Sequence, residues 1–65
     1  MRKLRRMIEH SKLIDIAAEI KAETDKAWKL FDGATESWVP KSQVEDNGDG
    51  TFTMPEWLAE DKGFV

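Results

Sequence analysis

Hydrophobic and polar positions alternate with a period of two through residues 13–23. Isoleucine and alanine occupy the even positions, and most of the odd positions are charged. This period is typical of a strand with one buried face, so it predicts a β-strand whose outward side carries Asp15, Glu19 and Glu23. Alanine and glutamate also favour helices, and a single helix over 3–22 is the alternative prediction.

Polar turns divide the next part of the chain into short strands. The sequence predicts reversals at 24–25 and 32–34, where Thr-Asp and Asp-Gly-Ala are residues that turns favour. Strands are expected over 26–31 and 35–39, after these reversals. Proline cannot donate a hydrogen bond to a β-ladder, so Pro40 ends the later strand or places it at the edge of a sheet.

The last third of the chain predicts a loop, a strand and a helix in succession. Ser42 and Glu45 have the spacing of a capping box, which predicts one short helical turn. A polar loop over 45–50 then leads into a strand over 51–54, and a helix is expected over 55–62.

Both ends of this final helix carry recognisable signals. Thr53 and Glu56 form a second capping-box pair, and Pro55 is tolerated in a first turn because its missing N–H group would be unpaired there anyway. Gly63 is expected to end the helix in the left-handed conformation. Phe64 would then fold back as the hydrophobic contact of the cap.

Together these elements predict an α+β fold with an N-terminal helix or arm, an antiparallel sheet of three to four strands, and a C-terminal helix packed on the sheet. The expected core consists of the large apolar residues on the inward faces: Ile14, Ile16, Ile20, Trp28, Leu30, Trp38, Val44, Phe52, Trp57 and Leu58. Replacing Trp57 with alanine is expected to cost about 3–5 kcal/mol. A chain of 65 residues forms one domain at most.

The net charge of −3 divides unevenly along the chain. Residues 1–12 carry five cations and one glutamate, a balance of +4, whereas residues 13–65 carry twelve carboxylates and five lysines, a balance of −7. The sequence therefore predicts a basic N-terminal helix or arm over 1–12 and a single acidic domain over 13–65. A short helix over 3–11 is expected in the arm, with a frayed arm as the alternative. The cations of the arm could contact phosphate groups of nucleic acid or anionic lipid, or they could simply balance the charge of the acidic domain.

Several classes of function find no support in the composition. The chain has no cysteine for a disulfide or a thiolate metal site. Its single histidine, His10, has no glycine-rich nucleophile motif to serve, so we expect no enzyme and no cofactor. No apolar run reaches the roughly 18 residues of a membrane span. The charged start is not followed by the apolar segment of an export signal, so we expect a cytoplasmic protein.

A calcium site is the sharpest chemical alternative. Residues 45–56 nearly satisfy the spacing of an EF-hand loop. Matching residues stand at its first, third, fifth, sixth and twelfth positions: Glu45, Asn47, Asp49, Gly50 and Glu56. The first ligand is normally aspartate, however, and Pro40 leaves room for only one helical turn before the loop. A tight reversal uses the same residues, so we expect the turn and no metal ligands.

Three segments resemble a short module of small phage and prophage proteins. They are Glu-Thr-Asp-Lys-Ala-Trp at 23–28, Trp-Val-Pro-Lys-Ser-Gln-Val at 38–44 and Pro-Glu-Trp-Leu-Ala-Glu-Asp-Lys-Gly at 55–63. The resemblance covers residues 13–65, with the basic arm as an addition. Carried on so short a chain, this module is similar to the phage-borne inhibitors of CRISPR immunity, specifically anti-CRISPR proteins against the type I-C system.

The resemblance implies an inhibitor acting in the host cytoplasm through protein contacts, without catalytic residues. DNA-binding grooves are lined with lysine and arginine, and an acidic body can occupy one as a DNA mimic. The expected partner is such a basic surface on the surveillance complex, specifically its large subunit. We predict the following partner-binding residues: Asp15, Glu19, Glu23, Glu36, Glu45, Asp46, Asp49, Glu56, Glu60 and Asp61. No small-molecule substrate, membrane or direct nucleic-acid binding is expected.

Two other interpretations of the charge remain open. The carboxylates of a small acidic protein can simply keep it soluble. Alternatively, the chain is a small phage nucleic-acid-binding or regulatory protein that uses the basic arm and an exposed aromatic side chain.

Overall fold

The computed structural model describes residues 12–65, which form six strands, a 3₁₀ helix and one α-helix. In chain order they are β1 (Leu13–Ala17), β2 (Glu19–Glu23), β3 (Ala27–Phe31), β4 (Glu36–Pro40), η2 (Lys41–Gln43), β5 (Glu45–Asp46), β6 (Thr51–Pro55) and α1 (Glu56–Lys62). The prediction of an α+β fold with a C-terminal helix is confirmed. The alternative helix over 3–22 is wrong from residue 13 onward, and the helix predicted over 3–11 lies outside the described residues.

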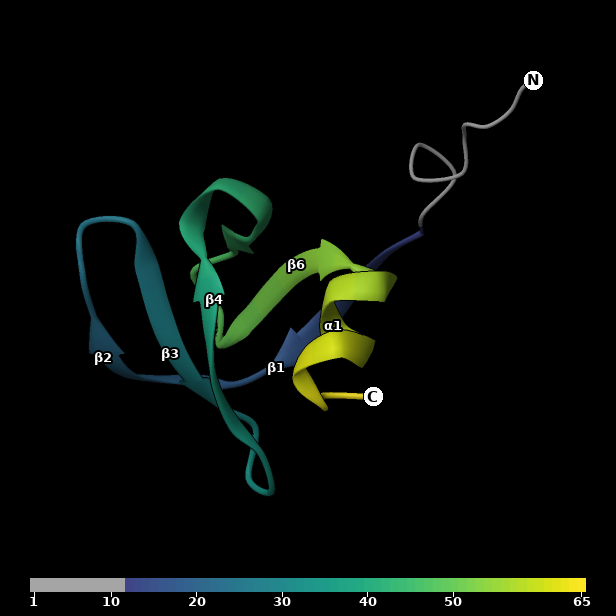
Figure 1. Cartoon of the computed structure of the whole chain (residues 1–65), viewed down its shortest axis with the longest axis horizontal. Helices are drawn as coiled ribbons and strands as arrows, with labels where there is room; N and C mark the ends of the chain where they lie inside the picture. Colours follow the sequence, from purple (N-terminus) through teal and green to yellow (C-terminus); the bar gives the residue numbers. More distant parts are fainter. Residues whose placement is uncertain (1–11) are drawn as a thin grey trace.

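The strand predicted over 13–23 is in fact two strands that bend apart at Ala18 and join different sheets. One antiparallel sheet has the order β1-β6-β5 and the other the order β2-β3-β4 (Figure 1). The backbone N–H of Ala18 donates to the carbonyl of Gly50 at 3.0 Å, which fixes the bend. Strands that pass between sheets in this way form the corners of two-sheet packings.

This bend changes the predicted display of charge. Asp15 belongs to the β1-β6-β5 sheet, whereas Glu19 and Glu23 belong to the β2-β3-β4 sheet. In addition, β2 pairs with β3 through an irregularity between Ile20 and Ala22, which shifts the register of its second half. The three carboxylates therefore do not form the single outward row that strict alternation predicted.

Both sheets and the helix contribute to one hydrophobic core. Its buried members are Ile16, Leu30, Val39, Val44, Phe52, Met54, Leu58, Ala59 and Phe64, with Ile14, Ala18 and Trp28 packed against them. The rings of Trp28 on β3 and Phe52 on β6 are 5.7 Å apart between centroids, so an aromatic contact links the two sheets. Of the predicted core, five members are buried as expected: Ile16, Leu30, Val44, Phe52 and Leu58.

Three predicted core residues are exposed instead. The exposed fractions of Ile20, Trp38 and Trp57 are 40%, 41% and 44%. On β4 the neighbouring Val39 is buried, and adjacent side chains of a strand point to opposite faces, so Trp38 must face outward. On α1 the buried positions are Leu58 and Ala59, which turns Trp57 toward solvent. The large cost predicted for replacing Trp57 by alanine therefore rested on a wrong placement.

The end of α1 follows the prediction, but its start does not. Gly63 adopts the left-handed conformation with φ of 85°, and the N–H of buried Phe64 donates to the carbonyl of Ala59 at 2.8 Å. At the start, no side chain caps the helix after Pro55, so the predicted capping box is wrong. The hydroxyl of Thr53 donates to Asp15 instead. The short helix η2 likewise has no side-chain cap.

Candidate functional site

Lysines form ion pairs with four of the ten predicted partner-binding carboxylates. These ion pairs lie on the β2-β3-β4 sheet, on η2 and on α1: Lys21 with Glu19 at 3.1 Å, Lys29 with Glu36 at 2.9 Å, Lys41 with Glu23 at 2.5 Å and Lys62 with Asp61 at 3.9 Å. Each of these four carboxylates already has a cation beside it. A partner would have to compete with that cation, so they are weaker candidates for binding a basic surface.

The pair of Glu23 and Lys41 is the most elaborate of the four. The Lys41 ammonium lies 5.4 Å from the centroid of the Trp28 ring, so it contacts the aromatic face and the carboxylate together. Its hydrogen bond to Glu23, followed by its charge, lowers the pKa of that carboxyl below the ordinary value. This cluster ties η2 to the β2-β3 hairpin and has a structural role.

A second group of carboxylates has no lysine partner among residues 12–65. It consists of Asp15 on β1, Glu45 and Asp46 on β5, and Asp49 in the loop before β6, all exposed. We call these four residues the acidic face: Asp15 and Glu45 lie on the outward side of the sheet opposite Thr53, whereas Asp46 pairs with buried Phe52 and lies with Asp49 at the hairpin end of that sheet. Asp15 and Glu45 are both paired in register with Thr53 of the central strand, so their Cα atoms are about 10 Å apart across the sheet. The β1-β6-β5 sheet and its hairpin thus carry four such carboxylates, whereas those on strands β2 and β4 are paired with lysines and, within the described part of the chain, the other sheet keeps unpaired ones, Asp25 and Asp32, only in its turns.

Asn47 and two threonines hold part of the acidic face in place. The Asn47 side-chain amide donates to the Oγ1 atoms of Thr53 at 2.9 Å and Thr51 at 3.1 Å. Each hydroxyl in turn donates to a carboxylate: Thr53 to Asp15 and Thr51 to Asp49, both at 2.6 Å. We call Asn47, Thr51 and Thr53 the Asn47 clasp. It fixes one oxygen of each carboxylate and leaves the others for a partner.

The local sequence explains why the clasp forms. In β6, Phe52 and Met54 are buried, so the alternation of the strand places Thr51 and Thr53 on the outer face. Gly48 and Gly50 have positive φ angles of 81° and 90°, which allow the tight reversal between β5 and β6. The N–H of Gly48 also donates to Asp46 at 2.9 Å. The reversal therefore places the Asn47 side chain within hydrogen-bonding distance of the two threonines.

Hydrogen bonds favour the ionised form of Asp49. The hydroxyl of Thr51, followed by its backbone N–H at 3.0 Å, lowers the pKa of this carboxyl below the ordinary value. Asp32 behaves in the same way, because the backbone N–H groups of Thr35 and Ala34 lower its pKa. Asp49 therefore keeps its negative charge well into mildly acidic solution.

These lowered pKa values predict that acid weakens the fold. In the unfolded chain the carboxyls of Glu23, Asp32 and Asp49 return to ordinary values, so the unfolded state takes up protons first as the pH falls. The stabilisation they give is thus complete above the ordinary values and is lost as the pH falls through the lowered ones. We expect the melting temperature to fall between about pH 5 and about pH 3. In Asp49→Asn the fall should be smaller. A melting temperature constant from neutrality to about pH 3 would contradict this assignment.

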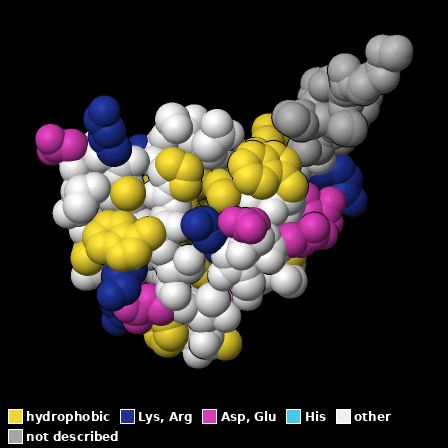
Figure 2. All heavy atoms as spheres, in the orientation of Figure 1, with side chains coloured by type: hydrophobic (Ala, Val, Ile, Leu, Met, Phe, Trp, Pro, Cys, Tyr) yellow, Lys and Arg dark blue, Asp and Glu magenta, His cyan; other side chains and the backbone are white. Residues whose placement is uncertain are grey.

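The last two predicted residues lie on α1. Glu56 is half-buried in the first turn, where a carboxylate interacts favourably with the helix dipole, and its backbone N–H donates to the carbonyl of Lys12 at 2.8 Å. Glu60 is exposed further along the helix. In the view of Figure 2, acidic side chains stand in separate places with hydrophobic and basic groups between them. The ten predicted residues are therefore several groups, of which the acidic face is the most concentrated.

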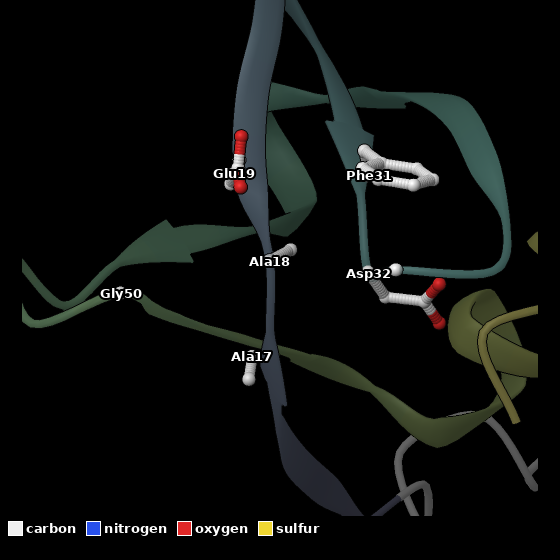
Figure 3. A pocket seen from close by; sticks show the side chains of 7 residues that line it. Ala17, Ala18, Glu19, Phe31, Asp32 and Gly50 are labelled. Carbon is white, nitrogen blue, oxygen red and sulfur yellow. The ribbon is translucent and has the colours of Figure 1, made fainter.

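The surface hollow at the bend between β1 and β2 contains few side chains that could take part in a reaction. It has a volume of about 380 Å³ and lies against Phe31, Asp32, Gly33 and Gly50 (Figure 3). The Asp32 carboxylate beside it accepts hydrogen bonds from the backbone N–H groups of Ala34 and Thr35, at 2.9 and 2.7 Å. That carboxylate shapes the turn, and the other carboxylate that lines the hollow, Glu19, is paired with Lys21.

The calcium interpretation loses its structural basis. Residues 45–56 form a hairpin and the first turn of α1, and the element before them is the three-residue 3₁₀ helix η2, where an EF-hand has a longer α-helix. Among residues 12–65 no group of three or more histidine, cysteine, aspartate or glutamate side chains is arranged to hold a metal ion. The same part of the chain has no helix long and apolar enough to cross a membrane.

The sequence identified the acidic residues but did not show which of them are paired with lysines. It treated Asn47 as a turn residue or a calcium ligand, although its amide organises the clasp. The alternation of Thr51 and Thr53 around buried Phe52 was the available signal for two outward hydroxyls. In comparisons with known proteins, no family model, no curated protein and no solved structure matches the chain.

Proposed function

We propose that this chain is a non-enzymatic inhibitor that acts as a DNA mimic. The acidic face, Asp15, Glu45, Asp46 and Asp49, would bind a basic DNA-binding surface of a type I-C CRISPR surveillance complex in the host cytoplasm. It would do so on the large subunit and exclude target DNA. The observation that carries the proposal is the separation of charge: this face has no lysine partner within residues 12–65, whereas the carboxylates on strands β2 and β4 are paired with lysines.

Unneutralised and pre-positioned charge is what a mimic requires. Complementary charge speeds the encounter with a basic groove and orients the protein in it. Because the Asn47 clasp already fixes Asp15 and Asp49, less side-chain freedom is lost when the partner binds. A partner lysine or arginine would meet these carboxylates without first displacing an internal lysine from the described part of the chain.

The choice of partner rests on the sequence resemblance of residues 13–65 to the phage module. Its Trp38 to Val44 segment covers the end of β4, the η2 turn and buried Val44, and so forms the link between the two sheets. A basic groove of another nucleic-acid-binding protein would satisfy the same physical argument. The resemblance is what selects the CRISPR complex.

A competition experiment tests the proposal. Purified type I-C surveillance complex is mixed with labelled target duplex and increasing amounts of the full chain, and bound DNA is measured by gel shift. We expect the chain to abolish DNA binding while binding no duplex itself. Full DNA binding in the presence of excess chain would refute the proposed target. A shift of the duplex by the chain alone would refute mimicry.

One observation favours a second candidate, a small nucleic-acid-binding protein. Trp38 is 41% exposed on the outer face of β4 and lies in register with Lys29 of β3. Exposed aromatic rings beside cations are used to stack bases of single strands. In that case the chain alone should bind single-stranded DNA, more weakly at high salt. Replacing Arg2, Lys3, Arg5 and Arg6 by alanine should remove the binding.

A further inference from the structure

The tip of the β5-β6 hairpin places an amide side chain next to the backbone nitrogen of a glycine. Asn47 and Gly48 are both exposed, and Gly48 has a positive φ of 81°. A β-carbon built on Gly48 would meet nothing within 4 Å. Because glycine has no side chain to obstruct its nitrogen, that nitrogen can approach the side-chain carbonyl carbon of the preceding asparagine.

We propose that Asn47 is a deamidation site, and that the hydroxyls of Thr51 and Thr53 restrain the reaction in the folded protein. In the reaction the Gly48 nitrogen loses its proton to solvent base and bonds to Cγ of Asn47. The bond from Cγ to Nδ2 breaks, and ammonia leaves with a proton from water. Water then opens the resulting cyclic imide at either carbonyl and yields aspartate or isoaspartate. The net change is the uptake of one water and the release of one ammonia.

Hydrogen bonds hold both reacting groups in the folded chain. The Asn47 amide donates to Thr53 Oγ1 at 2.9 Å and to Thr51 Oγ1 at 3.1 Å, which fixes the position of its carbon. The N–H of Gly48, whose nitrogen must attack, donates to Asp46 Oδ1 at 2.9 Å. The backbone N–H of Asn47 also donates to the carbonyl of Thr51 at 3.1 Å. Reaction therefore requires the clasp to open, and this inference is independent of the proposed function.

The product would differ sharply from the starting state. A carboxylate at this position has no hydrogen to donate to Thr51 and Thr53, whose own hydroxyl hydrogens are already committed to Asp49 and Asp15. Oxygen lone pairs would then face each other, and the clasp would be lost. The acidic face would also gain a fifth negative charge. In the isoaspartate product, an added methylene in the main chain would disturb the tight reversal.

Peptide mapping by mass spectrometry tests the inference. The full chain is incubated in mildly alkaline buffer, folded and in denaturant, and deamidation of the peptide that contains Asn47 is followed with time. We expect the folded chain to react at least about tenfold more slowly than the unfolded chain, because two side-chain hydrogen bonds must first break. Equal rates in the two states would overturn the inference.

Two double variants test whether the threonine hydroxyls of the clasp, and not only the rigidity of the fold, slow the deamidation of Asn47. T51V/T53V keeps the shape of the side chains but removes both acceptors, and we expect its folded form to react about tenfold faster than folded wild type. T51S/T53S keeps the hydroxyls and should react as slowly as wild type. Circular dichroism checks that each variant is folded, and T51V alone serves if the double valine variant is not. A folded valine variant that retains the wild-type rate would overturn the role of the hydroxyls.

Discussion

Replacing Leu30 with alanine is expected to lower the free energy of unfolding by about 2–5 kcal/mol. Leu30 is fully buried on β3, among core residues from both sheets and the helix. Its loss leaves a cavity in a domain whose total stability is about 3–10 kcal/mol for 65 residues. Thermal unfolding followed by circular dichroism should show a fall in melting temperature of about 10 °C or more.

Leu13→Ala is the matched control for this prediction. The same atoms are removed, but Leu13 is 69% exposed on edge strand β1. Its cost should be about 1 kcal/mol or less. Equal losses of stability for the two variants would contradict the placement of the core between the sheets.

The proposed function predicts that neutralising the acidic face strongly weakens inhibition. In D15N/E45Q/D46N/D49N the four side chains keep their size and their ability to accept hydrogen bonds, so the hairpin should still form. At roughly 0.5–1 kcal/mol for each exposed charge contact, the loss of four weakens binding by about 30-fold to 1000-fold. The readout is the concentration of chain that halves DNA binding by the surveillance complex.

The chain offers a control with the same change in net charge. E19Q/E23Q/E36Q/D61N also removes four negative charges, but only from carboxylates that already contact a lysine. Its effect on inhibition should be less than about tenfold, because only screened long-range charge is altered. Equal losses for the two variants would mean that total charge, and no particular face, governs binding.

Local signals in the sequence predicted most of the elements. The misplaced residues are those that were assigned to the wrong face of their strand or helix. The end of α1 was predictable because it depends on neighbouring residues: Gly63 adopts the left-handed conformation, and Phe64 packs back against the helix. The bend at Ala18 was not, because it needs the Gly50 carbonyl, which lies 32 positions later in the chain. Trp38 and Val39 are adjacent apolar residues, so alternation alone left open which of them faces the core.

The candidate site shows the same division between local and distant information. Composition identified every carboxylate of the acidic face, and the Asn-Gly pair marked the reversal. The distinction between paired and unpaired carboxylates depends on partners that are far apart in sequence. Lys41 is 18 residues from Glu23, and Thr53 is 38 residues from Asp15. Only the folded arrangement of the two sheets reveals which charges remain available.

The dissociation constant between the full chain and the surveillance complex, measured over a range of salt concentrations, tests the charge argument most directly. We expect the affinity of the wild-type chain to fall steeply as salt rises, because exposed charges on both partners are screened. D15N/E45Q/D46N/D49N should bind weakly and lose most of this salt dependence. A wild-type affinity that does not change with salt, or a variant that keeps the full salt dependence, would contradict binding through the acidic face.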